Sequence, residues 1–170
     1  AKIAALKSHT VDIISDFYNE HDLKAIEFGA DLGYVNWKDI GLNPYGNSLI
    51  VNGAYLAKNP KLVEDFVKIS QKAYAACVAD VEPCLKALLD QASGLDKENQ
   101  QRQWERIKFL MTDDFTTTKA LGWIDAERMK KDYDLVQTYL GMEKPFAVET
   151  AYTTRLLDPS VKMDAGKVKK

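Results

Sequence analysis

Cysteine, histidine and long apolar runs are scarce in this 170-residue sequence. Its two cysteines and two histidines form no Cys-x-x-Cys pair and no histidine-rich cluster, which argues against a zinc site. No apolar stretch approaches the roughly 18 residues that a transmembrane helix requires, so we predict none. The formal net charge is -2, whereas nucleic-acid-binding proteins usually present a basic face. Nucleic acid is therefore not an expected partner.

Motifs of the common hydrolases and peptidases are also missing. The sequence contains neither Gly-x-Ser-x-Gly nor His-Glu-x-x-His, the patterns that position a nucleophile or a catalytic zinc ion. We therefore predict no catalytic residue, no metal ligand and no cofactor. The first residues also lack the charged, apolar and small-residue pattern of a secretory signal peptide, which a mature chain would have lost.

The composition is that of an ordinary soluble globular protein. Hydrophobic residues make up 46% and charged residues 28% of the sequence, close to the averages for folded domains. A chain of this length suits one domain or slightly more. The apolar residues are numerous enough for one sizeable core.

The two cysteines, Cys77 and Cys84, leave two interpretations open. The simpler one is a pair of free, partly buried thiols. The other is a disulfide formed in an oxidising compartment. Because Pro83 begins a predicted helix, such a bridge would join the end of one helix to the start of the next.

The first fifty residues alternate between helical and extended patterns. Residues 1–8 are strong helix formers, and residues 20–30 place apolar side chains at helical spacing and end at Gly29. Three short runs that are β-branched or alternating are typical of strands, namely 11–15, 32–37 and 48–52. Because helices and strands alternate in an α/β layer, we predict an α/β fold.

Beyond residue 53 the sequence is rich in helical patterns. Asn59 and Pro60 predict a helix start, with Asn as the cap and Pro at the first helical position. The apolar residues that follow recur at helical spacing and form one face, namely Leu62, Phe66, Ile69, Ala73 and Cys77.

Further helices are expected over the rest of the chain. They are predicted at 83–92, after a cap at Asp96, as a brief turn over 116–123, and after a cap at Asp125. The helix after Asp96 has Trp104, Ile107, Lys108 and Met111 on one side. The polar tail at 164–170 is expected to be frayed.

Several stretches together carry a resemblance to a known family. They are "AKIAALKSHTVDIISDFYN", "NWKDIGLNPYGNSLIVN", "AYLAKNPKLVEDFVKISQKAYAACVADVEPCLKALL", and the pair "LGWIDAERMKKDYDLV" and "ETAYTTRLLDP". In this order and spacing, residues 1 to about 159 resemble the second half of a periplasmic solute-binding protein of an ABC transporter. The resemblance is to the branch that handles nitrate, sulfonates, taurine, riboflavin and thiamine-pyrimidine precursors.

The resemblance implies the C-terminal portion of a two-lobed periplasmic-binding-protein fold of type II, helix-rich after residue 53. Residues 1–38 would complete the second lobe, 39–47 would cross the hinge, and 48–170 would return to the first lobe. Family members are much longer, so most of the first lobe and the start of the second would precede this chain.

Two segments are candidate ligand-binding loops. Ligands of α/β proteins bind beyond the carboxyl ends of strands, and Asp16, Tyr18 and Asn19 follow the predicted strand 11–15. The carboxylate and amide could hydrogen-bond a polar ligand, and the ring of Tyr18 could stack on it.

The second segment is "DIGLNPYGN", which resembles the hinge crossover of the family. Crossovers in this fold lie along the floor of the cleft, and small-molecule sites favour such junctions. Tyr45 offers a ring and Asn47 an amide, and Trp37 lies two residues before the segment. The alternative is that these residues only shape the turn, as we expect for Pro44 and Gly46.

The resemblance implies that this protein captures a small polar or heteroaromatic molecule between two lobes and delivers it to an ABC permease in the membrane. It also implies a periplasmic or membrane-anchored extracytoplasmic location and no enzymatic activity. Two alternatives share the fold family. One is a thiamine-pyrimidine biosynthetic enzyme, whose cysteine-rich run would fall at 42–46, where this chain has no cysteine. The other is a ligand-sensing domain.

The same interpretation has a consequence for the isolated chain. If a large part of one lobe is absent, sheet edges and apolar helix faces remain uncovered, and such surfaces pair with other chains. We therefore expect the isolated chain either to self-associate, with 48–52 as the pairing edge, or to bind little ligand, because half of the cleft wall would be absent.

Overall fold

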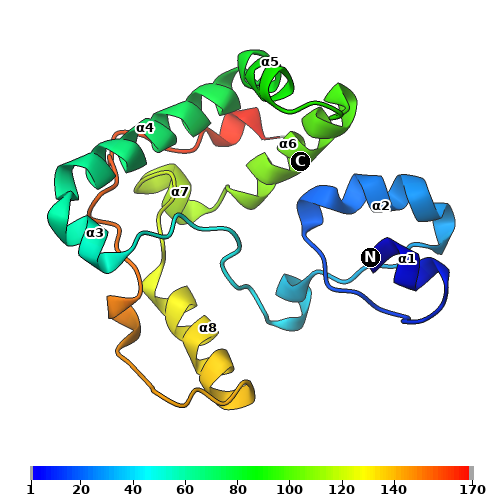
Figure 1. The fold of residues 1–170 in the computed structure, drawn as a ribbon, viewed down its shortest axis with the longest axis horizontal. Coiled ribbons are helices and arrows are strands. Elements are labelled where there is room, and N and C mark those ends of the chain that lie inside the picture. The colour runs from blue at the N-terminus through cyan, green and yellow to red at the C-terminus, as the bar shows by residue number, and fades with distance from the viewer. Residues whose placement is uncertain (1, 169–170) are drawn as a thin grey trace.

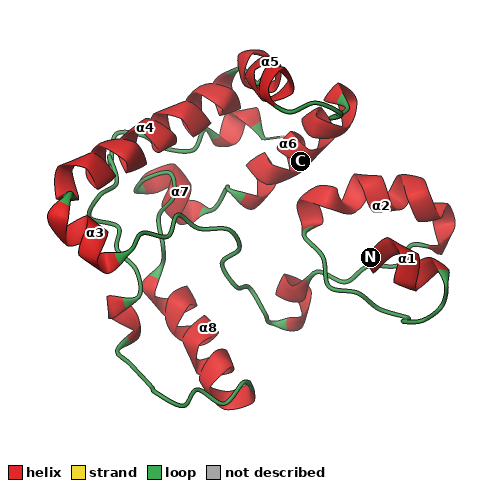
Figure 2. Cartoon of the chain, in the orientation of Figure 1, coloured by secondary structure: helices red, strands yellow, loops and turns green. Residues whose placement is uncertain are grey.

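The computed structural model describes residues 2–168, and these form short and medium helices joined by long loops (Figures 1 and 2). The α-helices are α1 (Lys2–Lys7), α2 (His21–Phe28), α3 (Gly53–Lys58), α4 (Pro60–Ala79), α5 (Glu82–Gln91), α6 (Lys97–Leu110), α7 (Asp114–Thr118) and α8 (Ala126–Tyr139). The 3-10 turns are η1 (Tyr18–Glu20), η2 (Gly29–Asp31), η3 (Trp37–Ile40), η4 (Val148–Thr150) and η5 (Ala165–Lys167). The helix-rich character predicted after residue 53 is confirmed.

The three predicted strands are not formed within residues 2–168. Segments 11–15, 32–37 and 48–52 are extended or turned but belong to no sheet. Most of their apolar side chains face solvent, with Ile13 86% and Ile50 95% exposed. A strand is stable only beside a hydrogen-bonded neighbour and over a buried face, and the described chain brings neither to these segments. The α/β class predicted from their composition is therefore not observed here.

The ends of the helices follow the sequence more closely. The side chains of Asp96 and Asp125 cap α6 and α8 by accepting hydrogen bonds from Asn99 N–H and Arg128 N–H, as predicted. At the start of α4, Asn59 occupies the predicted N-cap position. Pro60 is the first helical residue, but the Asn59 side chain donates to the Tyr55 carbonyl instead of capping the helix.

The core lies where α4, the α7 region and the C-terminal segment meet. Val78, Leu121 and Met163 are its buried centre, and Trp104 and Met111 from the predicted side of α6 pack against it. Buried Gln71 of α4 joins the three parts. Its amide donates to the Leu121 carbonyl at 2.8 Å, and its Oε1 accepts from Asp158 N–H at 2.7 Å.

The face of α4 that the sequence marks as apolar is not the face that enters this core. Val63, Gln71 and Val78 are the buried residues of α4, whereas the predicted face leaves Leu62, Phe66 and Ile69 largely exposed. The apolar residues do lie on one side of the helix, as predicted, but the described chain does not cover that side.

The surface of the chain is large for its mass. The accessible area is 12267 Å². Folded monomers of 19.1 kDa have about 8,400 Å² by the usual scaling of area with mass. The six buried apolar residues of the described chain form a small core, smaller than the composition allowed for.

The C-terminal segment is better anchored than predicted. Lys108, buried in α6, donates from Nζ to the Lys167 carbonyl at 2.9 Å, and Val168 packs against the core. The expectation of a frayed tail is therefore wrong for residues 164–168, while residues 169–170 lie outside the described part of the chain.

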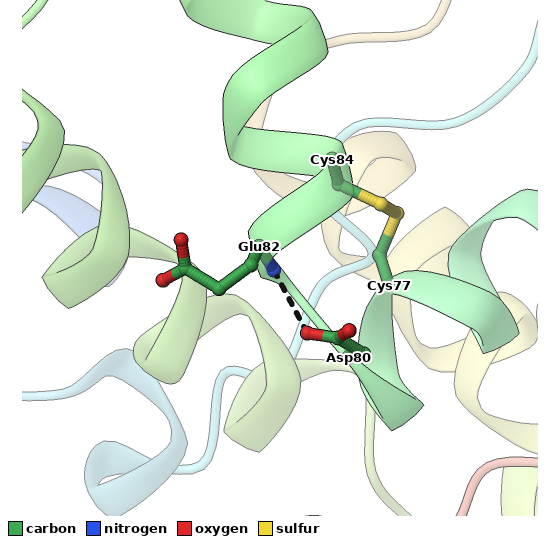
Figure 3. Close-up of a disulfide and its surroundings, with 4 residues drawn as sticks. All are labelled: Cys77, Asp80, Glu82 and Cys84. Carbon is green, nitrogen blue, oxygen red and sulfur yellow. Dashed lines mark hydrogen bonds between the residues drawn. A yellow bond between two sulfur atoms is a disulfide. The ribbon is translucent and has the colours of Figure 1, made fainter.

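Of the two interpretations of the cysteines, the structure has the disulfide. Cys77 in the last turn of α4 is bonded to Cys84 in the first turn of α5 (Figure 3). Asp80, in the short connection between them, accepts a hydrogen bond from Glu82 N–H at 3.1 Å. The bridge therefore fixes the corner at which the chain turns from α4 into α5.

The disulfide should stabilise the fold by restricting the unfolded chain. We expect the double variant Cys77→Ser, Cys84→Ser to lose about 2–3 kcal/mol of unfolding free energy, because the bridge closes a short loop. Urea denaturation followed by circular dichroism measures the difference. With a reductant present, the native chain should fall to the stability of the variant. Equal stabilities under oxidising conditions would contradict a formed bridge.

Candidate functional site

Three of the predicted ligand residues lie where the N-terminal part of the chain meets α6. Tyr18, in η1, is the centre of this contact. Its ring lies 4.5 Å from the guanidinium carbon of Arg106 and 6.2 Å, edge to face, from the ring of Phe109. His21 and Tyr34 complete the aromatic cluster, with centroids 5.6 and 6.0 Å from that of Tyr18. Burial is the largest effect on the Tyr18 hydroxyl and raises its pKa.

An ion pair holds the same contact together. Nε and Nη2 of Arg106 each donate to one carboxylate oxygen of Asp22, both at 2.7 Å. Such a two-point bond fixes both position and orientation. It lowers the pKa of the Asp22 carboxyl and raises that of Arg106. The pair is only partly exposed, so solvent screens it less than an ordinary surface pair.

Asp16 and Asn19 have partners of their own in this region. Asp16 accepts from Lys24 Nζ at 2.9 Å and from Phe17 N–H. Burial alone would raise the pKa of Asp16, but these two donors lower it. The Asn19 amide donates to Gln103 Oε1 of α6 at 3.3 Å. Both side chains therefore anchor η1 against α2 and α6.

A cavity opens beside Tyr18. Its volume is about 700 Å³, and its walls come from η1, α2 and α6: Tyr18, Asp22, Ala25, Ile26, Arg102, Glu105, Arg106 and Phe109. We call it the Tyr18 cavity. Its size is in the range of small-molecule sites, and it combines apolar walls with a few charged groups, as such sites do. Glu105 Oε2 is buried in this region and accepts no hydrogen bond within residues 2–168.

The crossover residue Tyr45 lies elsewhere, against the start of α8. The guanidinium carbon of Arg128 lies 3.9 Å from its ring centroid, and its hydroxyl accepts from Asp125 N–H at 2.7 Å. Its own N–H donates to Asp132 at 3.2 Å. Arg128 also donates to the Asn43 and Pro44 carbonyls. The crossover is thus held to α8 over 43–45. Burial raises the pKa of the Tyr45 hydroxyl.

The remaining two predicted residues are on the surface and are not part of the aromatic cluster. Trp37 begins η3 and is half exposed, and Asn47 is exposed. The crossover does come close to the first loop, because a Cβ on Gly46 would lie 4.0 Å from Phe17 Cε1. The two predicted loops are therefore neighbours, although their tyrosines have different partners.

A second hollow, of about 620 Å³, lies beside the disulfide, between α5 and the start of α6. Its charged residues pair with one another, as Lys86 with Asp90 and Lys97 with Glu82, and no aromatic residue lines it. We favour the Tyr18 cavity, because it offers a ring and partly buried charges. Across residues 2–168 no helix is both long and apolar enough to cross a membrane, and no cluster of three or more metal-binding side chains is present.

Sequence reasoning missed most of the partners of the predicted residues. Arg106, Phe109, Gln103 and Glu105 all come from α6, and Arg128 comes from α8. The one available signal was their helical spacing, which places Gln103, Arg106 and, less closely, Phe109 on one side of the helix. A single sequence contains no signal that this side of α6 contacts residues more than eighty positions earlier.

Comparison with known protein families gives a match over the first part of the chain. Residues 1–83 match the family model described as NMT1/THI5 like. This is a family of ABC solute-binding proteins of the nitrate, sulfonate and thiamine-precursor type, so the resemblance seen in the sequence is confirmed for these residues. The family implies the periplasmic-binding-protein fold. No curated protein and no solved structure showed a significant match.

The Asp22–Arg106 pair predicts a pH dependence of stability. Because the folded-state pKa of Asp22 is lowered, its contribution is present at neutral pH and is lost as the pH falls through that folded-state value. At neutral pH, Asp22→Asn should lose about 1 kcal/mol of unfolding free energy, a value discounted for partial exposure.

The measurement is urea unfolding of both proteins at several pH values, and the gap should close in acid. Asp90→Asn, which breaks the well-exposed pair with Lys86, is the matched control and should change little. A gap that persists unchanged in acid would show that the loss does not come from the ion pair.

The surroundings of Tyr45 predict that it stabilises the crossover. Tyr45→Phe removes the acceptor of the Asp125 N–H and should cost about 1 kcal/mol. Tyr45→Ala also removes the ring beneath Arg128 and should cost about 2 kcal/mol. Thermal or urea unfolding checks both, with Tyr139→Phe at the exposed end of α8 as the control. Unchanged stability of Tyr45→Ala, together with weaker ligand binding, would instead favour the stacking role predicted from sequence.

Proposed function

We propose, from the family match, that this chain is part of the solute-binding component of an ABC import system. It would capture a small polar or heteroaromatic molecule and present it to a membrane permease. The observation that carries the proposal is that the matched segment contains Tyr18, whose ring lines a cavity of about 700 Å³. Capture needs shape and hydrogen bonds but no catalytic group, and we expect no turnover.

The chemistry of the Tyr18 cavity supports a flat ligand with polar edges. The aromatic rings of Tyr18 and Phe109 give surfaces on which a ring can stack. Arg102 and Arg106 can attract an anionic group, although each already has an acidic partner. Glu105 also lines the cavity, and its carboxylate, which already pairs with Lys108, could accept a hydrogen bond from an N–H donor on the ligand.

The proposed division into lobes is compatible with the contacts. Residues 1–38 would belong to one lobe and 48–170 to the other, with 39–47 as the hinge crossover. Helix α2 and η1 meet the second part through α6, and the ion pair Asp22–Arg106 joins the two. In a hinge-bending protein, such contacts would open and close with the cleft.

The bond between Cys77 and Cys84 supports an extracytoplasmic location, since structural disulfides persist in oxidising compartments. Proteins of this family are usually extracytoplasmic. We therefore place the protein in the periplasm, free or anchored to the membrane.

Binding measurements test this function. We expect calorimetry or thermal-shift screening with nitrate, sulfonates, taurine, riboflavin and thiamine-pyrimidine precursors to find at least one ligand. Tyr18→Ala should then weaken its binding by roughly 1–3 kcal/mol, about 5- to 150-fold in Kd, because a stacking surface is lost. The control is Tyr139→Ala, remote from the cavity and 77% exposed.

Two results would contradict the proposal. Steady conversion of a bound compound into a product would favour the biosynthetic alternative. Full affinity in a folded Tyr18→Ala variant would remove the Tyr18 cavity as the site. A sensing domain would bind without turnover and without stimulating transport, so transport assays in reconstituted vesicles with the permease separate it from the import function.

A further inference from the structure

The charged side chains around the Tyr18 cavity neutralise one another. The cavity is lined by two arginines and two acids, namely Arg102, Arg106, Asp22 and Glu105. Each of the four belongs to a salt bridge within residues 2–168, and the three pairs are Arg106–Asp22, Arg102–Glu98 and Glu105–Lys108. An anion that enters the cavity must therefore open one of these pairs to gain a charged partner.

The two arginines differ in how firmly their acids hold them. Arg102 pairs with Glu98 of its own helix, and the side chains are 41% and 73% exposed, so water and salt screen this pair. Arg106 pairs with Asp22 of another helix through two hydrogen bonds of 2.7 Å, and these side chains are only 24% and 32% exposed. The charge of Arg106 is therefore the more completely neutralised of the two.

Asp22 lies where the anionic group of a ligand would bind Arg106. The edge of a guanidinium formed by Nε and one Nη matches the two oxygens of a carboxylate or phosphate group, and a sulfonate presents similar oxygens. In this structure the two oxygens of Asp22 accept from both donors of that edge. The guanidinium carbon also lies over the ring of Tyr18, 4.5 Å from its centroid. We call the edge with Nε and Nη2 the Arg106 fork.

The fold holds Asp22 in this position. Asp22 lies in the first turn of α2, where the helix dipole favours a carboxylate. The turn before it, η1, is joined to α6 by the hydrogen bond from Asn19 to Gln103. The hydrogen bonds from Arg106 keep the pKa of the Asp22 carboxyl below its usual range, so this group is ionised at neutral pH. An incoming anion must therefore compete with a carboxylate that is already in place.

On the basis of the proposed function, we propose that Asp22 determines the charge of the molecules that the Tyr18 cavity accepts. It fills the Arg106 fork and thereby excludes anionic ligands in favour of uncharged or cationic aromatic ones. A neutral ring contacts Tyr18 and Phe109, which line the same cavity, without breaking the bond between Asp22 and Arg106. In the ligand screen described above, nitrate and the sulfonates should therefore bind this cavity most weakly.

Three small probes test the role of Asp22 without knowledge of the natural ligand. Benzenesulfonate, benzenesulfonamide and benzamidine share a phenyl ring and are anionic, neutral and cationic at neutral pH. An NMR titration of the 170-residue chain measures weak binding of each probe and shows whether the shifted resonances belong to α6. The native chain should bind benzenesulfonate roughly tenfold more weakly than either of the other two probes, because the Arg106 fork is filled.

The decisive variant is Asp22→Asn. It keeps the size of the side chain but removes the charge, so Arg106 is no longer neutralised. We expect benzenesulfonate to bind the variant roughly tenfold more tightly than the native chain, while the affinity for benzenesulfonamide changes by less than about twofold. Circular dichroism verifies that the variant is folded.

Two controls separate the Arg106 fork from a general gain of positive charge. Asp90→Asn removes the same charge from an exposed pair with Lys86 outside the cavity, and it should leave the affinity for benzenesulfonate unchanged. In the Asp22→Asn background, Arg106→Gln should abolish the gain. Arg102→Gln, at a position one turn away on the same helix, should keep most of it.

Three results would overturn the inference. They are a native chain that binds benzenesulfonate as tightly as benzenesulfonamide, an Asp22→Asn variant that shows no gain, and a gain that survives Arg106→Gln. None of them contradicts ligand capture itself. That function fails if no natural ligand is found, or if the ligand is converted into a product, whatever the ratio of the probe affinities.

Discussion

The bond between Arg106 and Asp22 is the constraint on which the arrangement of the N-terminal part depends. The residues before the crossover contribute no buried apolar side chain to the core. Their position is set by Arg106, which holds Asp22 at two points and covers the ring of Tyr18. A contact made of charge and aromatic stacking is weaker than a packed core, and water can replace it. The proposed capture of a ligand between two lobes would require a contact of this kind.

A shortage of partners explains most of the differences between the expected and the observed fold. Segments 11–15, 32–37 and 48–52 have the side chains of strands but no neighbour with which to pair. The predicted apolar face of α4, which includes Leu62, Phe66 and Ile69, has the periodicity of a buried helix face but lies largely in solvent. Both cases have the same physical reason. A pattern of apolar residues predicts that one face of a segment is buried, but the element that buries it is a different segment, which the pattern does not specify.

What could be predicted from the sequence was local. The caps at Asp96 and Asp125, the start of α4 at Pro60 and the end of α2 before Gly29 depend on the chemistry of a few adjacent residues. The site was predictable only in part. Tyr18 was chosen for its type and its place in a loop, but its partners on α6 lie far along the chain, and no local signal encodes that contact. The disulfide likewise was one of two options until the turn between α4 and α5 was known.

Tyr18 and Tyr45 show why residue type alone does not decide a role. Both rings lie against an arginine, at 4.5 and 3.9 Å. The Tyr45 hydroxyl accepts a hydrogen bond from Asp125 N–H at the start of α8, and the Tyr45 N–H donates to Asp132. The side chain of Tyr45 therefore has a structural role. Tyr18 instead lines a cavity together with Glu105, which keeps an unused acceptor. Each ring has one face against an arginine, but the Tyr18 ring also lines a cavity, whereas the Tyr45 hydroxyl is bonded to the first turn of α8. We therefore propose ligand recognition at η1 and a structural role for the crossover.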